Sequence, residues 1–275
     1  MPNPIYQCLW FDENGKDAAK FYTSFFKNSE IIDDTQMVVT FELCGKKFMA
    51  LNGGPQFKFN PSISFFIICE DENEIDFLWK NFSNDGLVLM PLDKYEWSEK
   101  YGWIQDKFGI SWQLTLGKPN SEKEKIIPSF LFANSNFGRA EESIKFYTSI
   151  FENSNISEIY YDNETKNSVK YAEFNLLGEK FIAMDSNFQH NFSFNEAISI
   201  VVDCETQNEI DYYWNKLTQD GEENMCGWLK DKFGISWQIV PTILPKLLSD
   251  PTKTERVVKS FLQMKKFDIE KLLNA

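Results

Sequence analysis

The chain has 275 residues, of which 43% are apolar and 25% charged, so it is long enough for two domains with their own cores. Its 28 basic and 41 acidic side chains give a net charge of −13, which argues against a nucleic acid as partner. No apolar run approaches the length of a membrane span. The five scattered cysteines without a C-x-x-C pair, and the lack of a secretory pattern, indicate reduced thiols in a cytoplasmic protein.

Residues 1–117 are predicted to form one domain of two strand–helix–strands units. The first unit has apolar β-forming runs at 5–11, 37–43 and 48–51, with a helical stripe over 15–26. The second has a strand over 63–69, a helix over 75–82 and a hairpin with strands at 103–105 and 110–116. The aromatic-rich connection 87–101 is interpreted as a loop that either covers a cavity or packs against the domain.

Residues 118–127 are expected to be a polar linker, and 128–241 a second domain with the same order of elements. Its strands are predicted at 130–133, 171–177, 181–185 and 198–204, its helices over 140–151 and 210–217, and a hairpin over 227–238. Residues 242–275 are predicted to be a helical tail that docks on a neighbouring element.

The two halves are copies of one another. Gly102-Trp-Ile-Gln-Asp-Lys-Phe-Gly-Ile-Ser-Trp-Gln113 returns as Gly227-Trp-Leu-Lys-Asp-Lys-Phe-Gly-Ile-Ser-Trp-Gln238, and Lys20-Phe-Tyr-Thr-Ser returns at Lys145. The Asp-Lys-Phe-Gly segment is interpreted as a tight turn in which Asp bonds to its own backbone and Gly takes positive φ. Because successive strand residues face opposite ways, Trp112 and Trp237 are expected in the core if Gln113 and Gln238 face a cleft.

These motifs resemble the PhnB-like proteins, called 3-demethylubiquinone-9 3-methyltransferase-like, of the glyoxalase/bleomycin-resistance (vicinal oxygen chelate) superfamily. The residues that carry the resemblance are Leu9-Trp-Phe-Asp-Glu-Asn-Gly, Leu51-Asn-Gly-Gly-Pro-Gln-Phe57, the repeated hairpin and the tail from Val257. The resemblance implies an α+β fold of tandem domains, four βαβββ units in all, with curved mixed sheets that enclose clefts. Single-domain relatives commonly pair as dimers. This chain is therefore expected to be a monomer with an intramolecular pseudo-dimer, or a homodimer.

Enzymes of this superfamily hold a divalent metal in the cleft. The resemblance places the corresponding positions of this chain at Gln7, Ala50, Ser64 and Gln113 in the first half and at Ser129, Ala183, Ser199 and Gln238 in the second. Neutral side chains would leave the charge of a divalent cation uncompensated, so neither a metal nor another cofactor is expected. Asp185 would join the second set only by a one-residue shift.

The sequence singles out no catalytic residue, and whether the protein is an enzyme stays open. The first functional hypothesis is a metal-free cleft that binds a small apolar or aromatic molecule through Gln7, Asn52, Ser64, Gln113, Ser199 and Gln238. The first alternative is a metal-dependent lyase or dioxygenase that uses other ligands. The second is a structural or interaction protein whose clefts are filled by Phe and Trp.

Overall fold

The computed structural model describes residues 5–163, 165 and 168–275. They form two compact units. The larger unit is Leu9–Ile198, and the smaller unit combines residues 5–8 with Ser199–Ala275. Among the residues that the structure describes, no helix is both long and apolar enough to cross a membrane.

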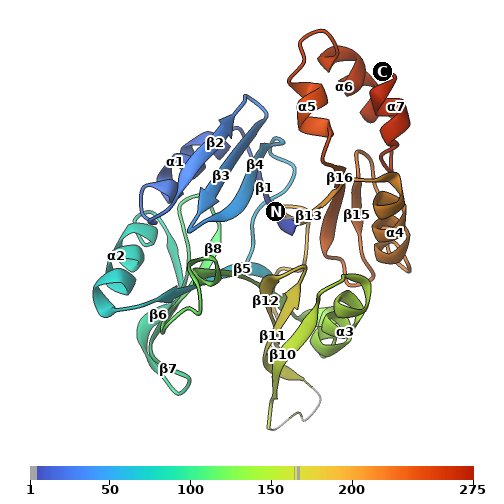
Figure 1. The fold of residues 1–275 in the computed structure, drawn as a ribbon. Coiled ribbons are helices and arrows are strands. Elements are labelled where there is room, and N and C mark those ends of the chain that lie inside the picture. The colour runs from blue at the N-terminus through green and yellow to red at the C-terminus, as the bar shows by residue number, and fades with distance from the viewer. Residues whose placement is uncertain (1–4, 164, 166–167) are drawn as a thin grey trace. The chain divides into compact units, whose positions relative to one another are not determined.

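Three successive strand–helix–strands units, labelled in Figure 1, make up the larger unit, except that residues 5–8 of the first strand belong to the smaller unit. The first comprises β1 (Ile5–Phe11), α1 (Gly15–Thr23), β2 (Glu30–Asp34), β3 (Val38–Leu43) and β4 (Lys46–Asn52). The second comprises β5 (Ile63–Cys69), α2 (Glu72–Phe82), β6 (Leu87–Tyr95), β7 (Ser98–Gln105) and β8 (Ser111–Leu116). After η1 (Glu122–Lys125), the third comprises β9 (Ile126–Phe132), η2 (Asn134–Asn136), α3 (Ala140–Ile150), β10 (Asn155–Tyr161), β11 (Val169–Leu176) and β12 (Glu179–Asp185).

The second and third units share one mixed sheet, with strand order β10-β11-β12-β9-β5-β8-β7-β6. Its centre is the antiparallel pair β5–β9, in which Ser64 lies opposite Ser129. β5 also pairs in parallel with β8, and β12 pairs in parallel with β9. This sheet joins strands on either side of the expected linker 118–127, so the halves pair with each other within the larger unit. The predicted domain boundaries stay a prediction.

Helices α2 and α3 pack on one side of this sheet, α2 along β5, β7 and β8 and α3 along β10 to β12 (Figure 1). The side chains on that side form an aromatic core. The Trp112 ring stacks on Phe82 of α2 at 5.1 Å and contacts Phe65 at 5.3 Å and Tyr22 of α1 at 5.3 Å. Trp112 is 1% exposed, so the expectation that it belongs to the core is confirmed.

Two edge strands and one extended hairpin lie where the sequence indicated connections. β2 and β10 are edge strands in the sheets of the described residues, paired with β3 and β11, and each leaves much of its length exposed. The 87–101 connection is not a loop, because β6 and β7 extend the sheet as a twisted hairpin with several register shifts. The conformation predicted for this connection was therefore wrong.

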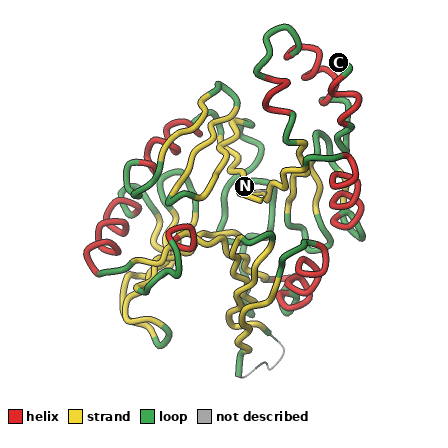
Figure 2. Tube along the Cα trace, in the orientation of Figure 1, coloured by secondary structure: helices red, strands yellow, loops and turns green. Residues whose placement is uncertain are grey.

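The smaller unit contains β13 (Ile198–Cys204), α4 (Gln207–Leu217), β14 (Glu222–Glu223), β15 (Trp228–Lys230) and β16 (Ser236–Pro241). Its strands follow the order β14-β15-β16-β13-β1. The tail forms three short helices joined by loops (Figure 2): α5 (Leu244–Leu248), α6 (Thr254–Phe261) and α7 (Ile269–Leu273). The tail docks as expected, because Cys226 and Gly227 donate backbone hydrogen bonds to Met264 and Lys265.

The fold is thus α+β, with strand–helix–strands units arranged in mixed sheets, as predicted.

Candidate functional site

The repeated Asp-Lys-Phe-Gly segments are structural turns. Asp106 Oδ1 accepts hydrogen bonds from the backbone N–H groups of Phe108 and Ile110 at 2.8 and 3.1 Å. Its Oδ2 accepts from Trp112 Nε1 and Tyr22 Oη at 2.8 and 2.7 Å. Asp231 accepts the equivalent bonds from Phe233, Ile235 and Trp237 in the second copy, and both turn glycines have positive φ. The interpretation of this motif as a turn is therefore confirmed.

The side of the shared sheet opposite α2 and α3 carries Ser64 and Gln113, two of the predicted binding residues. The strand registers bring together on this side Ser64, Phe66, Tyr101, Trp103, Gln113, Ile127, Ser129, Tyr171 and Glu173, here called the polar–aromatic face. Residues on neighbouring strands of one face lie side by side. The face therefore gathers side chains from both halves of the sequence.

A chain of hydrogen bonds occupies its centre. The Gln113 Nε2 donates to Ser64 Oγ at 2.8 Å, and the hydroxyl of Tyr101 donates to Gln113 Oε1. All three side chains are at most 4% exposed. The structure thus places Ser64 and Gln113 together, as the cleft hypothesis required, and adds Tyr101. Sequence reasoning missed Tyr101 because it assigned that residue to a loop.

The serine opposite Ser64 is different. Ser129 is 1% exposed, and its Oγ has no hydrogen-bond partner among the described residues. A buried hydroxyl without a partner costs roughly 1–3 kcal/mol relative to a satisfied one. On the same face Ser111 Oγ accepts a hydrogen bond from Trp103 Nε1 at 2.7 Å. Ser129 therefore leaves hydrogen-bonding capacity available at the centre of the face.

Aromatic rings surround this polar centre. Phe66 lies between Tyr101 and Tyr171, with ring centroids 6.3 Å from each. Tyr95 and Trp97, from the β6–β7 hairpin, both contact the Tyr101 ring at 5.6 Å. Trp97 is 56% exposed, so this aromatic group reaches solvent.

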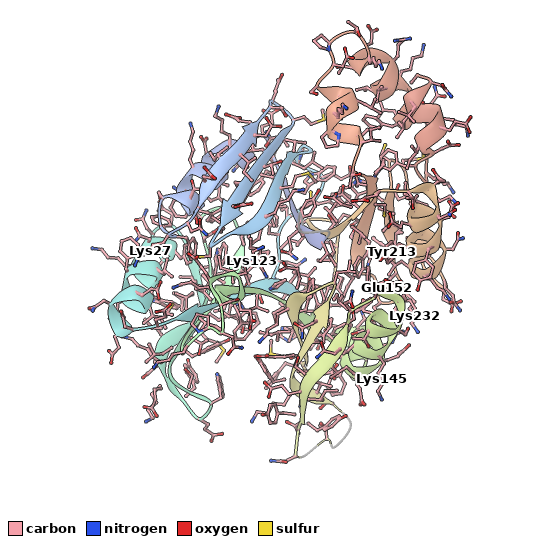
Figure 3. All side chains as sticks on the ribbon, in the orientation of Figure 1. Lys27, Lys123, Lys145, Glu152, Tyr213 and Lys232 are labelled. Carbon is pink, nitrogen blue, oxygen red and sulfur yellow. The ribbon has the colours of Figure 1, made fainter. Side chains whose placement is uncertain are left out.

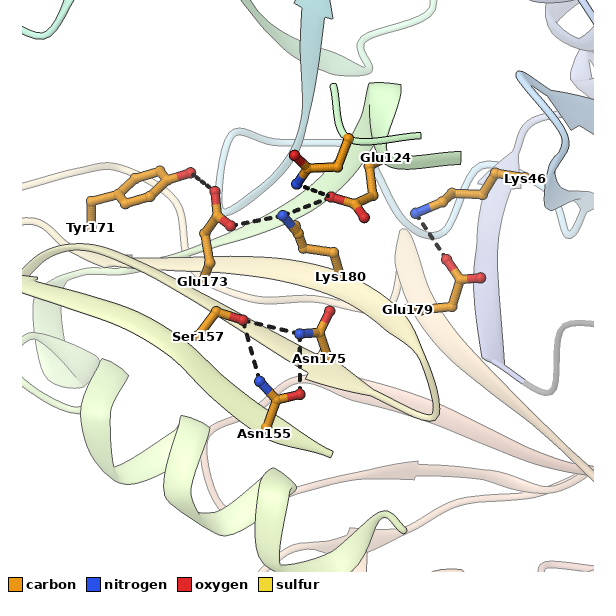
Figure 4. Close-up of polar contacts among 10 residues, drawn as sticks. Lys46, Glu124, Asn155, Ser157, Tyr171, Glu173, Asn175, Glu179 and Lys180 are labelled. Atoms are coloured by element: carbon orange, nitrogen blue, oxygen red, sulfur yellow. Dashed lines mark hydrogen bonds and ion pairs between the residues drawn. The ribbon is translucent and has the colours of Figure 1, made fainter. Parts of the chain in front are cut away.

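Charged side chains end the face on the β11–β12 side (Figure 4). Lys180 Nζ lies 2.9 Å from Glu173 Oε2 and 2.7 Å from Glu124 Oε2, and the hydroxyl of Tyr171 donates to Glu173 Oε1 at 2.6 Å. The hydrogen bond from Lys180 holds the pKa of Glu124 below its usual value. These groups are only partly exposed, and they mark the polar limit of the aromatic wall.

A second, related centre lies in the smaller unit. Gln238 Nε2 donates to Ser199 Oγ at 2.9 Å, and both side chains act on the nearby thiol of Cys8. Burial raises the pKa of the Cys8 thiol to about 12, while Gln238 and Ser199 oppose this rise. Ser236 Oγ, close by in register with Ser199, has no partner among the residues described. The predicted pair Ser199 and Gln238 is thus brought together, with a thiol that sequence reasoning did not select.

Gln7 does not join this centre. The hydroxyl of Tyr6 donates to Asp203, and Cys8 lies beside Gln238 and Ser199, so strand alternation turns Gln7 to the opposite side of β1. Gln7 is 2% exposed, and its Oε1 has no partner within the described part of the chain. The resemblance pointed to Gln7, whereas the next residue, Cys8, is the one that lies at this centre. A ligand contact by Gln7 stays a prediction.

Asn52 and Asp185 have a common structural task. Asn52 Oδ1 accepts a hydrogen bond from Gly15 at the start of α1, at 2.9 Å. Asp185 Oδ1 accepts from Gly138 and Ala140 at the start of α3, at 2.8 and 3.2 Å. Both side chains cap free N–H groups of a helix N-terminus. A ligand role for Asn52 stays a prediction.

The residues at the two centres do not fit a divalent metal. The larger unit offers Ser64, Gln113 and Ser129, and the smaller unit offers Ser199 and Gln238 with a protonated thiol. These neutral donors supply no charge to balance a cation and no imidazole. Among the described residues, no group of three or more His, Cys, Asp or Glu side chains is placed to hold a metal ion.

The described cavities lie elsewhere. One of about 460 Å³ in the larger unit is bordered by Trp10, Phe57, Phe59 and Phe108, among others. One of about 480 Å³ in the smaller unit lies between Gln207 and the tail residues near Phe267. Neither is lined by Gln113 or Gln238. The Asn52-Gly-Gly loop instead holds the Trp10 indole, whose Nε1 donates to Gly54 O at 2.8 Å.

This arrangement of βαβββ units defines a protein of the glyoxalase superfamily fold. Glyoxalase I from Zea mays is 10% identical to this chain, covers 86% of it and 93% of its own length, and superposes with a TM-score of 0.55. That likeness supports the fold alone. A PhnB protein from Bacillus cereus, titled a putative 3-demethylubiquinone-9 3-methyltransferase, is 37% identical over 41% of this chain and 98% of its own, with a TM-score of 0.39.

The family model described as 3-demethylubiquinone-9 3-methyltransferase matches residues 3–115 and again residues 124–240. The chain belongs to this family, and it carries the family's unit twice. A comparison with curated proteins gave no match. The resemblance read from the sequence is confirmed in both family and fold.

Proposed function

We propose that this chain binds a small molecule with an aromatic or apolar body on the polar–aromatic face, without a metal ion held by side chains. The observation that carries the proposal is the buried, unpartnered hydroxyl of Ser129 beside the Ser64–Gln113–Tyr101 chain. A ligand with one neutral hydrogen-bonding group would satisfy Ser129. Its apolar body would lie against Phe66 and the rings of the β6–β7 hairpin.

The charge pattern favours an uncharged group at the buried end of such a ligand. Ser64, Gln113 and Ser129 offer donors and acceptors but no formal charge. A charged ligand group there would lose its hydration without an opposite charge to replace it. The partly exposed Glu173, Lys180 and Glu124 lie farther along the face, where water still reaches.

The test is a thermal-shift screen with neutral substituted phenols and benzamides, on wild type and on the variants Ser129→Ala and Ser236→Ala. A ligand present at 100 times its Kd stabilises the folded state by about 2.7 kcal/mol, which raises Tm by roughly 5–10 °C at this size. Ser129→Ala is expected to fold and to lose the shift. Ser236→Ala removes a hydroxyl of the smaller unit that also has no partner among the described residues, and this variant is expected to keep the shift.

A shift that is lost with Ser236→Ala and kept with Ser129→Ala would contradict the assignment to the larger unit. The metal-free part has its own test. One equivalent of Zn, Ni, Mn or Fe in untagged protein, with a shift lost on chelation, would favour the alternative of a metal-dependent lyase or dioxygenase.

One observation favours a second candidate, a structural or interaction protein. Phe66 lies between Tyr101 and Tyr171 and occupies space that a ligand would need. If the face is only a core, no compound raises Tm, and Ser129→Ala is at least as stable as wild type. The ligand screen thus distinguishes the two candidate functions, whereas the stability of Ser129→Ala does not.

A cytoplasmic location and function as a single chain or a homodimer belong to the same proposal. Five free cysteines, four of them buried, suit a reducing compartment.

A further inference from the structure

Each half begins with a βαβββ unit whose last two strands form a hairpin. These two hairpins, β3–β4 and β11–β12, share a sequence pattern and a turn. In the first half it reads Leu43-Cys-Gly-Lys-Lys-Phe48, and in the second Leu176-Leu-Gly-Glu-Lys-Phe181. Cys44 and Gly45 have φ of 52° and 72°, and Leu177 and Gly178 have φ of 52° and 85°. Two successive residues with positive φ are typical of a type I′ turn. Lys46 and Glu179 therefore hold the same position, directly after the turn glycine.

These two equivalent residues contact each other inside the larger unit. Lys46 Nζ lies 3.0 Å from Glu179 Oε2, and the side chains are only 4% and 12% exposed (Figure 4). When equivalent positions of two copies touch, they lie where a twofold axis relating the copies would pass. In a symmetric pair of identical copies, such positions carry the same residue. Lysine would then face lysine, or glutamate would face glutamate, away from water.

The linker between the halves lies at the same place. Glu124 of η1 pairs with Lys180 of the second half, while Lys125 of η1 lies within ion-pair distance of Glu74 of the first half. Lys123, labelled in Figure 3, comes from this helix too, and its side chain lies close to Gly45. Asn28 Nδ2 donates to Glu122 at 3.3 Å. Contacts to both halves thus converge on the turn that precedes β9.

We propose that the Lys46–Glu179 pair is a recognition contact that makes the first half of the sequence pair with a second half, and that excludes pairing of like halves. The partner that fits the Lys46 hairpin is the Glu179 hairpin, and no copy of the Lys46 hairpin can replace it. A buried like-charge contact costs several kcal/mol, whereas the opposite charges here satisfy each other. This inference is independent of any ligand.

The first test is a charge-reversal cycle in the full chain, with Lys46→Glu, Glu179→Lys and the double swap. Each single reversal is expected to lower Tm by about 10 °C, because breaking a buried pair leaves two like charges. The double swap is expected to recover most of the loss. Lys94 and Glu99 form an exposed pair at 2.7 Å, and reversing them is the matched control, with little change expected.

The second readout separates recognition from simple stabilisation. The variant Lys46→Met/Glu179→Met makes the two equivalent positions identical and apolar, which like halves tolerate. All variants are refolded at high concentration, and the fraction of oligomers larger than the native wild-type protein is measured. This fraction is expected to be several-fold higher for the methionine pair than for wild type or the double swap. This measurement remains valid if the single reversals do not fold.

A double swap as unstable as the single reversals would overturn the proposal. So would equal mass distributions for wild type, the swap and the methionine pair, because charge would then not select the partner.

Discussion

The carboxylate of Asp106 accepts a hydrogen bond from the indole of Trp112 at 2.8 Å, and Asp231 holds Trp237 at the same distance. The aspartate of each turn thus fixes a buried tryptophan that lies six residues later in the sequence. The substitution Asp106→Asn leaves the size unchanged but converts one acceptor into a donor that faces other donors. We expect it to lower the free energy of unfolding by about 3 kcal/mol in urea titrations.

The exposed Asp12→Asn change is the control for that measurement and should be neutral within about 0.5 kcal/mol. A loss of less than about 1 kcal/mol for Asp106→Asn would mean that the four hydrogen bonds to this carboxylate contribute little net stability.

Ser64 and Ser129 lie opposite each other across β5 and β9 but differ in their bonds. Ser64→Ala leaves the Gln113 amide without its acceptor and is expected to cost about 1–2 kcal/mol. Ser129→Ala removes a hydroxyl that has no partner in the described part of the chain and is expected to be neutral or stabilising. Urea unfolding of both variants checks the difference, and equal losses would contradict it.

Acidification should weaken the network around Lys180. The hydrogen bond from Lys180 lowers the pKa of Glu124 below 4.5 in the folded chain. A lowered folded-state pKa contributes stability above the unfolded value, and this contribution is lost as the pH falls through the folded-state pKa. Lys180→Met is therefore expected to cost about 1 kcal/mol at pH 7, and less as the pH falls below about 4.5.

Unfolding free energies of wild type and Lys180→Met at pH 7 and pH 4 give this comparison. Lys94→Met, at an exposed pair, should show little difference at either pH. A gap for Lys180→Met that widens on acidification would contradict the assigned direction.

Gly86, between α2 and β6, lies where a side chain would not fit. A Cβ there would lie 2.3 Å from Phe82 O and 2.6 Å from Gln105 O, both backbone atoms. Gly86→Ala is expected to cost about 2–3 kcal/mol, because the backbone must shift. Gly117→Ala meets only Ile68 Cγ2 at 3.2 Å and should cost less. Differential scanning calorimetry of the two variants tests the order.

The five thiols should react at different rates. Cys8, Cys44, Cys69 and Cys204 are buried, and burial raises the pKa of Cys8 and of Cys44 to about 12. Cys226 is half-buried, so iodoacetamide should modify it first in the native protein. Mass spectrometry after timed labelling gives the order, and faster labelling of Cys8 would show that its centre opens to solvent.

The sequence predicted the elements whose side chains are buried on one or both faces. The strand at 63–69, the helix stripe around Ile75, Leu78 and Phe82, and the buried tryptophans all appear as expected. The repeat and the family resemblance added the order of the units. These signals are strong because core positions fix the period of apolar residues.

The sequence could not predict the edges or the pairing of units. β2 and β10 are exposed edge strands, so burial does not impose a regular alternation of apolar and polar residues on them. The pairing of β5 with β9 joins residues that are remote in sequence, so local patterns carry no trace of it. The polar centre at Cys8 was missed by one residue, which in a strand is the difference between opposite faces.

The two polar centres already differ, because the thiol of Cys8 lies beside the serine and glutamine in one unit, while the hydroxyl of Ser129 lies opposite Ser64 in the other. An assembly of identical subunits receives every substitution twice, so a change that improves one site alters its twin as well. A duplicated chain is free of that coupling. One centre can drift or specialise while the other preserves the inherited role, and mutational tolerance should therefore be unequal between them.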